Sequence, residues 1–266
     1  MYRSIILLTA TVNPGGMSYT VLQDPEERKN QYIEAINYYL HETDIPVVFV
    51  ENTGCDFSYL FKSYINDNRL EYLTFKGNTY DKLKGKGYGE ANMIIYAINN
   101  SKYVRNAKYI TKITGRLIVY NIQSIVTSPA LYFGNVFRTN IEDLSFVSTT
   151  VLSTSPYILK TLLERHKEEI TEEDRGNNWI ENVLARSIVS DKDVRLVLFP
   201  FIKPPLFDSF SGTSNSKYYI KNSYLNATDN MALGAKLCKL RGATLNAIFL
   251  KIFFYCFIVY YKVVRK

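Results

Sequence analysis

Small and polar residues follow two predicted strands of this chain at the point where each strand ends. The first strand closes on Thr9-Ala10-Thr11, and the second closes on Glu51-Asn52. In a parallel sheet the carboxyl ends of the strands share one edge, and ligands bind beyond that edge. A carboxylate placed there can bond the ribose or base of a nucleotide, so both strand ends are candidate nucleotide contacts. The alternative for Glu51 is an exposed turn residue.

A segment rich in glycine and lysine stands directly before a predicted helix. It reads Lys84-Gly85-Lys86-Gly87-Tyr88-Gly89-Glu90. Glycines let the backbone approach a ligand closely, and the free N–H groups at a helix start attract anions. The segment is therefore a candidate diphosphate cradle, with contacts from Lys84, Lys86, Gly87, Gly89 and Glu90. Its spacing is that of neither a P-loop nor a dinucleotide fingerprint, and the alternative is a plain flexible loop.

A predicted alternation of strands and helices positions these residues. Apolar and β-branched runs predict the strands, and helical spacing predicts the helices. The predicted strands are 4–11, 46–51, 70–75 and 109–114, and the predicted helices are 25–42, 57–66 and 90–100. Strands separated by helices of this length imply a mostly parallel sheet with right-handed crossovers. The predicted fold class is therefore α/β, with helices flanking the sheet.

Beyond residue 121 the pattern is less regular. Further strands are predicted at 131–138, 145–153 and 194–200, and further helices at 156–167 and 178–190. Such a change suits a second subregion that holds a different ligand on the same scaffold. We therefore expect one domain, 1–230, with a nucleotide-binding half at 1–121 and an acceptor and catalytic half at 122–230.

The fourth predicted strand ends in Thr114-Gly115-Arg116, and here a family resemblance becomes visible. The resemblance also rests on four other elements of the sequence. They are the two strand ends, the glycine segment with its helix, the acidic stretch 172–174 before a helix, and a proline-rich strand exit leading to 211–214. In order and spacing they resemble the nucleotide-sugar glycosyltransferases of the GT-A fold, particularly those of bacterial capsule and lipopolysaccharide synthesis. The resemblance covers roughly residues 1–210. It implies a GT-A-like sheet, a nucleotide-sugar donor and sugar transfer.

The sequence departs from this family because no Asp-x-Asp metal motif follows the fourth strand. The Asp-x-Asp that the chain does carry, Asp191-Lys192-Asp193, suits a surface turn. A departing diphosphate needs nearby positive charge, which a metal or basic side chains can supply. The resemblance then implies that Arg116, with Lys84 or Lys86, takes the place of the metal, and that Gly115 binds the donor beside Arg116. We expect transfer without a divalent metal or another cofactor.

An inverting sugar transferase needs a carboxylate that takes the proton of the acceptor hydroxyl. The resemblance places such a base near Asp174, at the mouth of a predicted helix. Glu181, at the edge of the apolar stripe of that helix, is the second candidate. The alternatives are that Asp174 caps the helix and that Glu181 pairs with Arg186 or Arg175.

A late loop, Ser211-Gly212-Thr213, offers two hydroxyls and a flexible glycine. Under the resemblance it would close over the phosphates of the donor, with Lys217 nearby. The alternative is a surface loop that binds no ligand.

The excess of positive charge is confined to the C-terminal tail. The formal net charge is +7. Seven basic residues and no acidic one follow position 230, which leaves 25 basic and 25 acidic residues in 1–230. A nucleic-acid-binding domain spreads basic charge over its folded face. We therefore expect no nucleic-acid partner and read 231–266 as a separate tail.

The tail is apolar, aromatic and basic from 244 to 266. Its uninterrupted apolar stretch, 252–261, is ten residues long, whereas a spanning helix needs roughly 20. Lys251, Tyr255 and Lys262 gather on one side of a helical wheel, as is typical of an amphipathic helix lying on an anionic membrane surface. We expect membrane association through 244–266. A docked terminal helix and a spanning helix are the alternatives.

The start of the chain predicts a strand, because its apolar run is too short for a signal peptide. Three scattered cysteines show no metal-ligand or redox spacing. We therefore expect an enzyme at the cytoplasmic side of the inner membrane, which extends a membrane-presented glycan or lipid-linked acceptor. The alternatives are a phosphosugar transferase and a non-catalytic, membrane-tethered scaffold of a polysaccharide assembly complex.

Overall fold

The computed structural model describes most of the chain up to residue 207 and single residues of the tail. The described residues are 2–17, 20–128, 135–136, 145–173, 177–194, 196, 198–199, 201, 205–207, 235, 239, 245, 248, 251–252 and 255–256. Asp174, the loop 211–213 and the continuous course of the tail lie outside them. No helix within the described part is long and apolar enough to cross a membrane.

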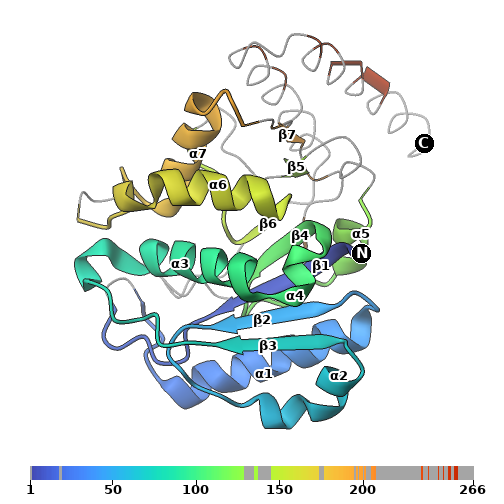
Figure 1. The fold of residues 1–266 in the computed structure, drawn as a ribbon, viewed down its shortest axis with the longest axis vertical. Helices are drawn as coiled ribbons and strands as arrows, with labels where there is room; N and C mark the ends of the chain where they lie inside the picture. The colour runs from blue at the N-terminus through green and yellow to red at the C-terminus, as the bar shows by residue number, and fades with distance from the viewer. Residues whose placement is uncertain are drawn as a thin grey trace.

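Seven strands of the described part form one sheet in the order β3-β2-β1-β4-β6-β5-β7 (Figure 1). They are β1 (Tyr2–Ala10), β2 (Val47–Glu51), β3 (Leu70–Thr74), β4 (Ala107–Thr114), β5 (Asn135–Val136), β6 (Val151–Thr154) and β7 (Leu198–Phe199). The strands β1 to β4 are mutually parallel where they pair, and so are β5 and β7. Only β6 runs antiparallel to its neighbours β4 and β5 within this sheet. The protein is a mixed α/β fold with a mostly parallel sheet.

Helices cover both faces of the sheet. They are α1 (Pro25–Glu42), α2 (Lys62–Asn66), α3 (Gly85–Asn100), α4 (Lys102–Arg105), α5 (Ile122–Val126), α6 (Pro156–His166) and α7 (Ile180–Ser190), with short 3-10 turns at Ser58–Phe61, Lys82–Lys84 and Lys167–Glu169. Alternate residues of β1 point to opposite faces, as a strand requires. Ile6 and Leu8 pack on the α1 side, whereas Ile5 and Leu7 pack on the side of α3, α6 and α7. The sheet therefore carries two apolar layers.

Local sequence signals set the bounds of α1. Asp24 accepts a hydrogen bond from the Glu27 N–H at 2.8 Å, and Pro25 occupies the first turn. An aspartate cap and a proline at the helix start both favour initiation at this position. The helix therefore keeps the bounds predicted from its spacing.

The helix predicted at 90–100 starts earlier in the structure. Helix α3 begins at Gly85, so the glycine segment forms its first turns rather than a loop before it. A Cβ atom added to Gly87 would lie 3.1 Å from Ile180 of α7. The glycine lets α3 and α7 approach closely, and this packing outweighs the low helix propensity of glycine.

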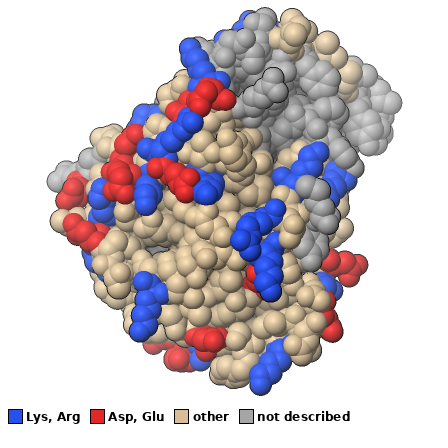
Figure 2. Space-filling model, in the orientation of Figure 1, with Lys and Arg blue, Asp and Glu red and all other residues tan. Residues whose placement is uncertain are grey.

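The surface charge agrees with a body of balanced composition. On the face drawn in Figure 2, acidic and basic side chains are interspersed rather than separated. Some of them form ion pairs, such as Lys160 with Glu164 and Arg186 with Glu169. A single broad basic face is not seen among the described residues in this view.

Candidate functional site at the switch point of the sheet

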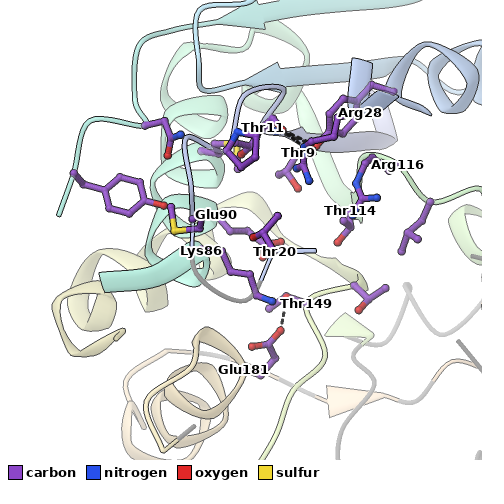
Figure 3. Close-up of a pocket in the computed structure, with 18 residues that line it drawn as sticks. Thr9, Thr11, Thr20, Arg28, Lys86, Glu90, Thr114, Arg116, Thr149 and Glu181 are labelled. Atoms are coloured by element: carbon purple, nitrogen blue, oxygen red, sulfur yellow. Dashed lines mark hydrogen bonds between the residues drawn. The ribbon is translucent and has the colours of Figure 1, made fainter. Parts of the chain in front are cut away.

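The order of the strands reverses at β1, which has β2 on one side and β4 on the other. Ligands of open α/β sheets bind beyond the carboxyl ends of the strands at such a point. A pocket of about 180 Å³ lies there, and we call it the central pocket. It is lined by Thr9, Thr11, Pro14, Met17, Thr20, Arg28, Tyr32, Asn78, Tyr80, Lys86, Glu90, Met93, Thr114, Arg116, Leu117, Thr149, Thr150 and Glu181 (Figure 3).

Six of the residues predicted from sequence line the central pocket together. They are Thr9, Thr11, Lys86, Glu90, Arg116 and Glu181. They come from the end of β1, the first turns of α3, the exit of β4 and the first turn of α7. The fold therefore brings to one cavity basic and acidic groups that are far apart in the sequence.

Glu51 lies elsewhere and serves the fold. Its carboxylate is fully buried and accepts hydrogen bonds from the N–H groups of Val12, Thr53 and Cys55 at 2.9–3.1 Å. The hydroxyl groups of Thr53 and Thr74 donate to it as well. Glu51 is therefore occupied in joining the loops after β1, β2 and β3.

The neighbours of Glu51 in the predicted nucleotide site are also buried. Ala10 pairs with Glu51 across β1 and β2, and the Asn52 N–H donates to the Ala10 carbonyl at 3.2 Å. Asn52 Oδ1 is buried without a hydrogen-bond partner. Neither residue lines the central pocket, so the contribution of the β2 end to the site is to shape the loop that follows β1.

Some residues of the glycine segment line the central pocket, and others pack against neighbouring elements. Lys84 points away from the central pocket and donates to the Glu168 carbonyl at 3.0 Å. Gly87 packs on α7, and a Cβ atom at Gly89 would lie 2.2 Å from the Tyr80 hydroxyl. Lys86 and Glu90 alone of this segment line the pocket.

The first N–H groups of α3 already hold an anion. Glu172 Oε1 accepts a hydrogen bond from the Lys86 N–H at 3.1 Å, and its side chain lies against Gly85. Gly85 makes room for this carboxylate because it has no Cβ atom, which would lie 2.3 Å from Glu172 Cδ, and its φ of 77° is one that glycine adopts readily. The N–H groups that were predicted to bind a diphosphate are therefore capped by Glu172. The cation that the segment offers to a phosphate is the Lys86 side chain.

Gly115 and Arg116 form the exit of β4 beside the end of β1. A Cβ atom at Gly115 would lie 2.6 Å from the Thr9 carbonyl oxygen, so a glycine is needed for this close approach. Its N–H donates to the same carbonyl at 2.9 Å. Arg116, the next residue, lines the pocket, and its Nη1 donates to Gln31 Oε1 of α1 at 2.9 Å.

Two residues of α1 that the sequence analysis missed also line the pocket. Arg28 is buried and donates to the carbonyls of Thr11 and Leu22 at 2.7 and 3.1 Å. It also donates to the Tyr32 hydroxyl at 3.1 Å, and that hydroxyl accepts the Thr11 N–H at 3.0 Å. Arg28 and Tyr32 thus hold the loop after β1 in place. An arginine within an otherwise apolar helix face was the signal for this role.

The opposite wall of the pocket carries Glu181. Its Oε1 accepts a hydrogen bond from the Thr149 hydroxyl at 2.8 Å (Figure 3). Arg186, the partner considered from sequence, bonds the Asn177 carbonyl and the Asn178 side chain instead. Glu181 is therefore directed into the pocket rather than into a surface ion pair.

A buried lysine lies behind this wall. Lys112 of β4 has no exposed surface and pairs with Glu90. Its ammonium also donates to the Thr149 carbonyl at 2.6 Å. Burial lowers the pKa of Lys112, and the charge of Glu181 opposes this shift.

Lys86 and Tyr80 both line the pocket, and the charge of Glu172 acts on both of them. Burial lowers the pKa of Lys86, an effect opposed by the carboxylates of Glu172 and Glu181. Burial also raises the pKa of Tyr80 to about 12, and Glu172 adds to this rise. At neutral pH these groups give the pocket one hydroxyl donor and one partly desolvated ammonium.

The Asp191-Lys192-Asp193 turn is occupied by ion pairs on the surface. Arg165 contacts Asp191 and Asp193 at 3.1 and 2.8 Å, and His166 contacts Asp191 at 3.0 Å. Within the described residues no group of three or more His, Cys, Asp or Glu side chains could hold a metal ion. The turn is placed as the sequence predicts, at the end of α7.

The central pocket holds cationic and anionic side chains in one cavity, and each kind can act on a different part of a substrate. Lys86 and Arg116 can neutralise a phosphate, because charge-assisted hydrogen bonds to ionised groups are strong. Glu181 can accept a proton from a hydroxyl that enters the same cavity. The other two sequence candidates, Asp174 and the loop 211–213, lie outside the described residues.

The chain matches no known family model and no curated protein sequence. Solved structures of low identity resemble it. One is described as a nucleotide-diphospho-sugar transferase of Desulfovibrio desulfuricans G20 (10% identity, TM-score 0.44, 75% of this chain and 80% of that chain). Another is TarS 1-349 of S. aureus in complex with UDP (10% identity, TM-score 0.40, 89% of this chain and 65% of that chain). A cytidylyltransferase of Leptospira borgpetersenii has 11% identity, a TM-score of 0.38 and 97% coverage of both chains.

Proposed function

We propose that this chain is a glycosyltransferase with a GT-A-like fold that moves a sugar from a nucleotide-sugar donor to a membrane-presented glycan or lipid-linked acceptor. The observation that carries the proposal is the opposition of charges in the central pocket. Lys86 and Arg116 line it together with Glu181, at the switch point of the sheet. The chemistry needs a cation for the departing diphosphate and a base for the acceptor hydroxyl, and one cavity offers both.

The donor would lie with its diphosphate between Lys86 and Arg116. In Figure 3 the Arg116 side chain lies near Thr114, and Lys86 extends from α3 toward Thr149 and Glu181. Burial makes the ammonium of Lys86 a poorly solvated cation, which strengthens its attraction for a phosphate. The two cations would neutralise the leaving group, so we propose that transfer needs no divalent metal.

The acceptor would present its hydroxyl to Glu181. The carboxylate takes the hydroxyl proton while the acceptor oxygen forms a bond to the anomeric carbon of the sugar. The bond from that carbon to the diphosphate oxygen breaks, and its electron pair leaves with the nucleoside diphosphate. Thr149 fixes one carboxylate oxygen of Glu181 at 2.8 Å, which leaves the other to receive the proton.

A membrane-bound acceptor would explain the tail. Leu245, Ile248, Ile252 and Tyr255 are each helical, and each residue is between 49% and 82% exposed. In one continuous helix, residues three or four positions apart share a face, so we propose that these four side chains form one apolar stripe. With seven basic residues and no acidic one after position 230, such a stripe fits the anionic inner leaflet of a bacterial membrane. We propose that residues 244–266 hold the enzyme there, on the cytoplasmic side, for surface polysaccharide synthesis.

The activity is tested by offering the full chain a panel of nucleotide sugars with a lipid-linked acceptor and measuring release of the nucleoside phosphate. The expected result is turnover of one donor, and a loss of at least about 100-fold in kcat for Glu181→Gln with donor affinity retained. Glu164→Gln, on the exposed side of α6, is the matched control. A pocket that binds no donor would support the scaffold alternative, and a phosphodiester in the product would identify a phosphosugar transferase.

The membrane role is tested by sedimentation with vesicles. The full chain should sediment with phosphatidylglycerol vesicles and much less with phosphatidylcholine vesicles, because the tail is basic. A chain ending at residue 243 should remain in the supernatant with both. Equal sedimentation of the shortened and full chains would contradict the role of the tail.

A further inference from the structure

The ammonium of Lys112 is surrounded by oxygen atoms that belong to the central pocket. It contacts a carboxylate oxygen of Glu90, the Thr149 carbonyl at 2.6 Å and the Thr114 hydroxyl at 3.5 Å. A lysine ammonium has three N–H donors. Each can therefore be assigned to one of these acceptors, and all three acceptors lie on residues that line the pocket.

The lysine itself takes no part in the pocket surface. Its side chain has no exposed area, whereas that of Glu90 is 19% exposed. A buried charge without partners is strongly unfavourable, so its retention in the central strand needs a reason. A packing role alone would be filled by an apolar residue, as at Ile110 and Ile113 of the same strand.

The contacts of Lys112 continue to Glu181. Thr149 accepts from Lys112 with its carbonyl oxygen and donates to Glu181 Oε1 with its hydroxyl at 2.8 Å. Lys112 thus reaches one pocket carboxylate, Glu90, directly and the other, Glu181, through a single residue. The two carboxylates come from α3 and α7, which belong to different halves of the chain.

We propose that Lys112 is a positioning residue that fixes the two pocket carboxylates, Glu90 directly and Glu181 through Thr149. The role in catalysis rests on the proposed function, in which Glu181 takes the acceptor proton. Lys112 itself contacts neither donor nor acceptor. Its loss should lower the rate of the proton-transfer step and leave donor binding to Lys86 and Arg116 almost unchanged.

The kinetic test compares Lys112→Met with Lys108→Met, the same change at an exposed lysine of β4. We expect kcat of Lys112→Met to fall at least about 100-fold, in line with loss of a positioned base, with the dissociation constant of the donor nucleotide within about twofold of wild type. Lys108→Met should behave as wild type. A kcat within about threefold of wild type, or a parallel loss of donor affinity, would overturn the proposal.

Thr149→Val provides the test that does not depend on tolerance of a buried methionine. It removes the hydroxyl that holds Glu181 and keeps the carbonyl that holds Lys112. This variant should fold with the thermal stability of wild type and reproduce most of the loss in kcat. Wild-type kcat in Thr149→Val would contradict the link from Lys112 to Glu181.

A ligand-free measurement separates this proposal from the proposed function. The measurement is ¹³C NMR of protein labelled with carboxyl-¹³C glutamate, in which Glu181→Gln assigns the resonance of Glu181. Lys112→Met should shift the resonances of both Glu90 and Glu181. Thr149→Val should shift mainly that of Glu181, and Lys108→Met neither. An unmoved Glu181 resonance in Lys112→Met overturns the positioning role, whatever substrate the enzyme uses. Absence of turnover in wild type, with the shifts present, would reject only the proposed function.

Discussion

Glu172 caps the helix that carries Lys86: its Oε1 accepts the Lys86 N–H at 3.1 Å. The same lysine sends its side chain into the central pocket. One residue therefore has its backbone N–H bound to an internal carboxylate and its side chain in the lining of the site. The helix start is neutralised from within, so the attraction of the pocket for a diphosphate must come from side chains.

The capping carboxylate makes stability depend on pH. Burial raises the pKa of Glu172, and Lys86 opposes this rise only in part. A raised pKa in the folded state means that the stabilising contribution is fully present below the unfolded pKa and is lost as pH rises through the folded pKa. We expect Glu172→Gln, which resembles the protonated side chain, to equal or exceed wild type in urea unfolding at pH 7.5, and to lose this advantage at pH 4.5.

The control for this prediction is Glu173→Gln, an exposed neighbour. It should show no such dependence on pH. Destabilisation of Glu172→Gln by more than about 1 kcal/mol at pH 7.5 would show that the ionised carboxylate is a net stabilising cap.

Arg116 should be needed for transfer but not for folding. Its guanidinium lines the pocket rather than the apolar core, and its Nη1 donates to the neutral side chain of Gln31 in α1. We expect Arg116→Ala to lower kcat/KM at least about 100-fold, the loss typical of a missing charge-stabilising donor. Arg105→Ala, at an exposed arginine of α4, should leave the activity unchanged. Near-normal turnover in Arg116→Ala would remove it from the diphosphate site.

His166 should stabilise the junction of α6 and α7 mainly at acidic pH. Burial opposes its protonation, but its hydrogen bonds to Glu169 and Asp191 prevail and raise its pKa. This contribution is complete below pH 6.5, the unfolded value, and is lost as pH rises through the folded pKa. We expect His166→Gln to cost up to about 1 kcal/mol in urea unfolding at pH 5.5 and much less at pH 8.5. An equal cost at both pH values would indicate packing rather than charge.

Two glycines should respond differently to a methyl group. In Gly115→Ala the new Cβ would lie 2.6 Å from the Thr9 carbonyl oxygen, which belongs to the backbone of the central strand and cannot move freely. We expect a loss of about 1–3 kcal/mol in the free energy of unfolding. In Gly87→Ala the contacts are with Cβ and Cγ2 of Ile180 at 3.1 Å, which requires α3 and α7 to separate by only a few tenths of an ångström. The gain in helix propensity of about 1 kcal/mol should then offset most of the cost. Equal effects in thermal unfolding would contradict this reading.

The sequence was a sufficient guide where apolar patterns are strong. The helix at 25–42 and the strands near 47–51 and 70–74 have their predicted positions, because their spacing and end signals agree. The direction of β6 was not predicted. Its four residues are all buried, so no alternation marks a face, and direction depends on pairing with β4.

Some of the residues that line or support the pocket were predicted from the sequence, and others were missed. Strand ends and the residues Lys86, Arg116 and Glu181 could be proposed from order and type. Thr149 could not, because its role depends on β6 lying antiparallel beside β4. Lys112 did leave a signal, a lysine that stands between Thr111 and Ile113 near the end of a strand whose other lysine, Lys108, lies near its start. Pairing such a residue with Glu90 requires the tertiary structure.

The most direct test of the central claim is calorimetric titration of the full chain, purified in mild detergent, with UDP, GDP, CMP and dTDP, each with Mn²⁺ and with EDTA. The account predicts selective binding of one nucleotide with the same dissociation constant, within about twofold, in both conditions. Binding only with Mn²⁺ would contradict the replacement of a metal by Lys86 and Arg116. Binding of none of the four would contradict a nucleotide-sugar transferase.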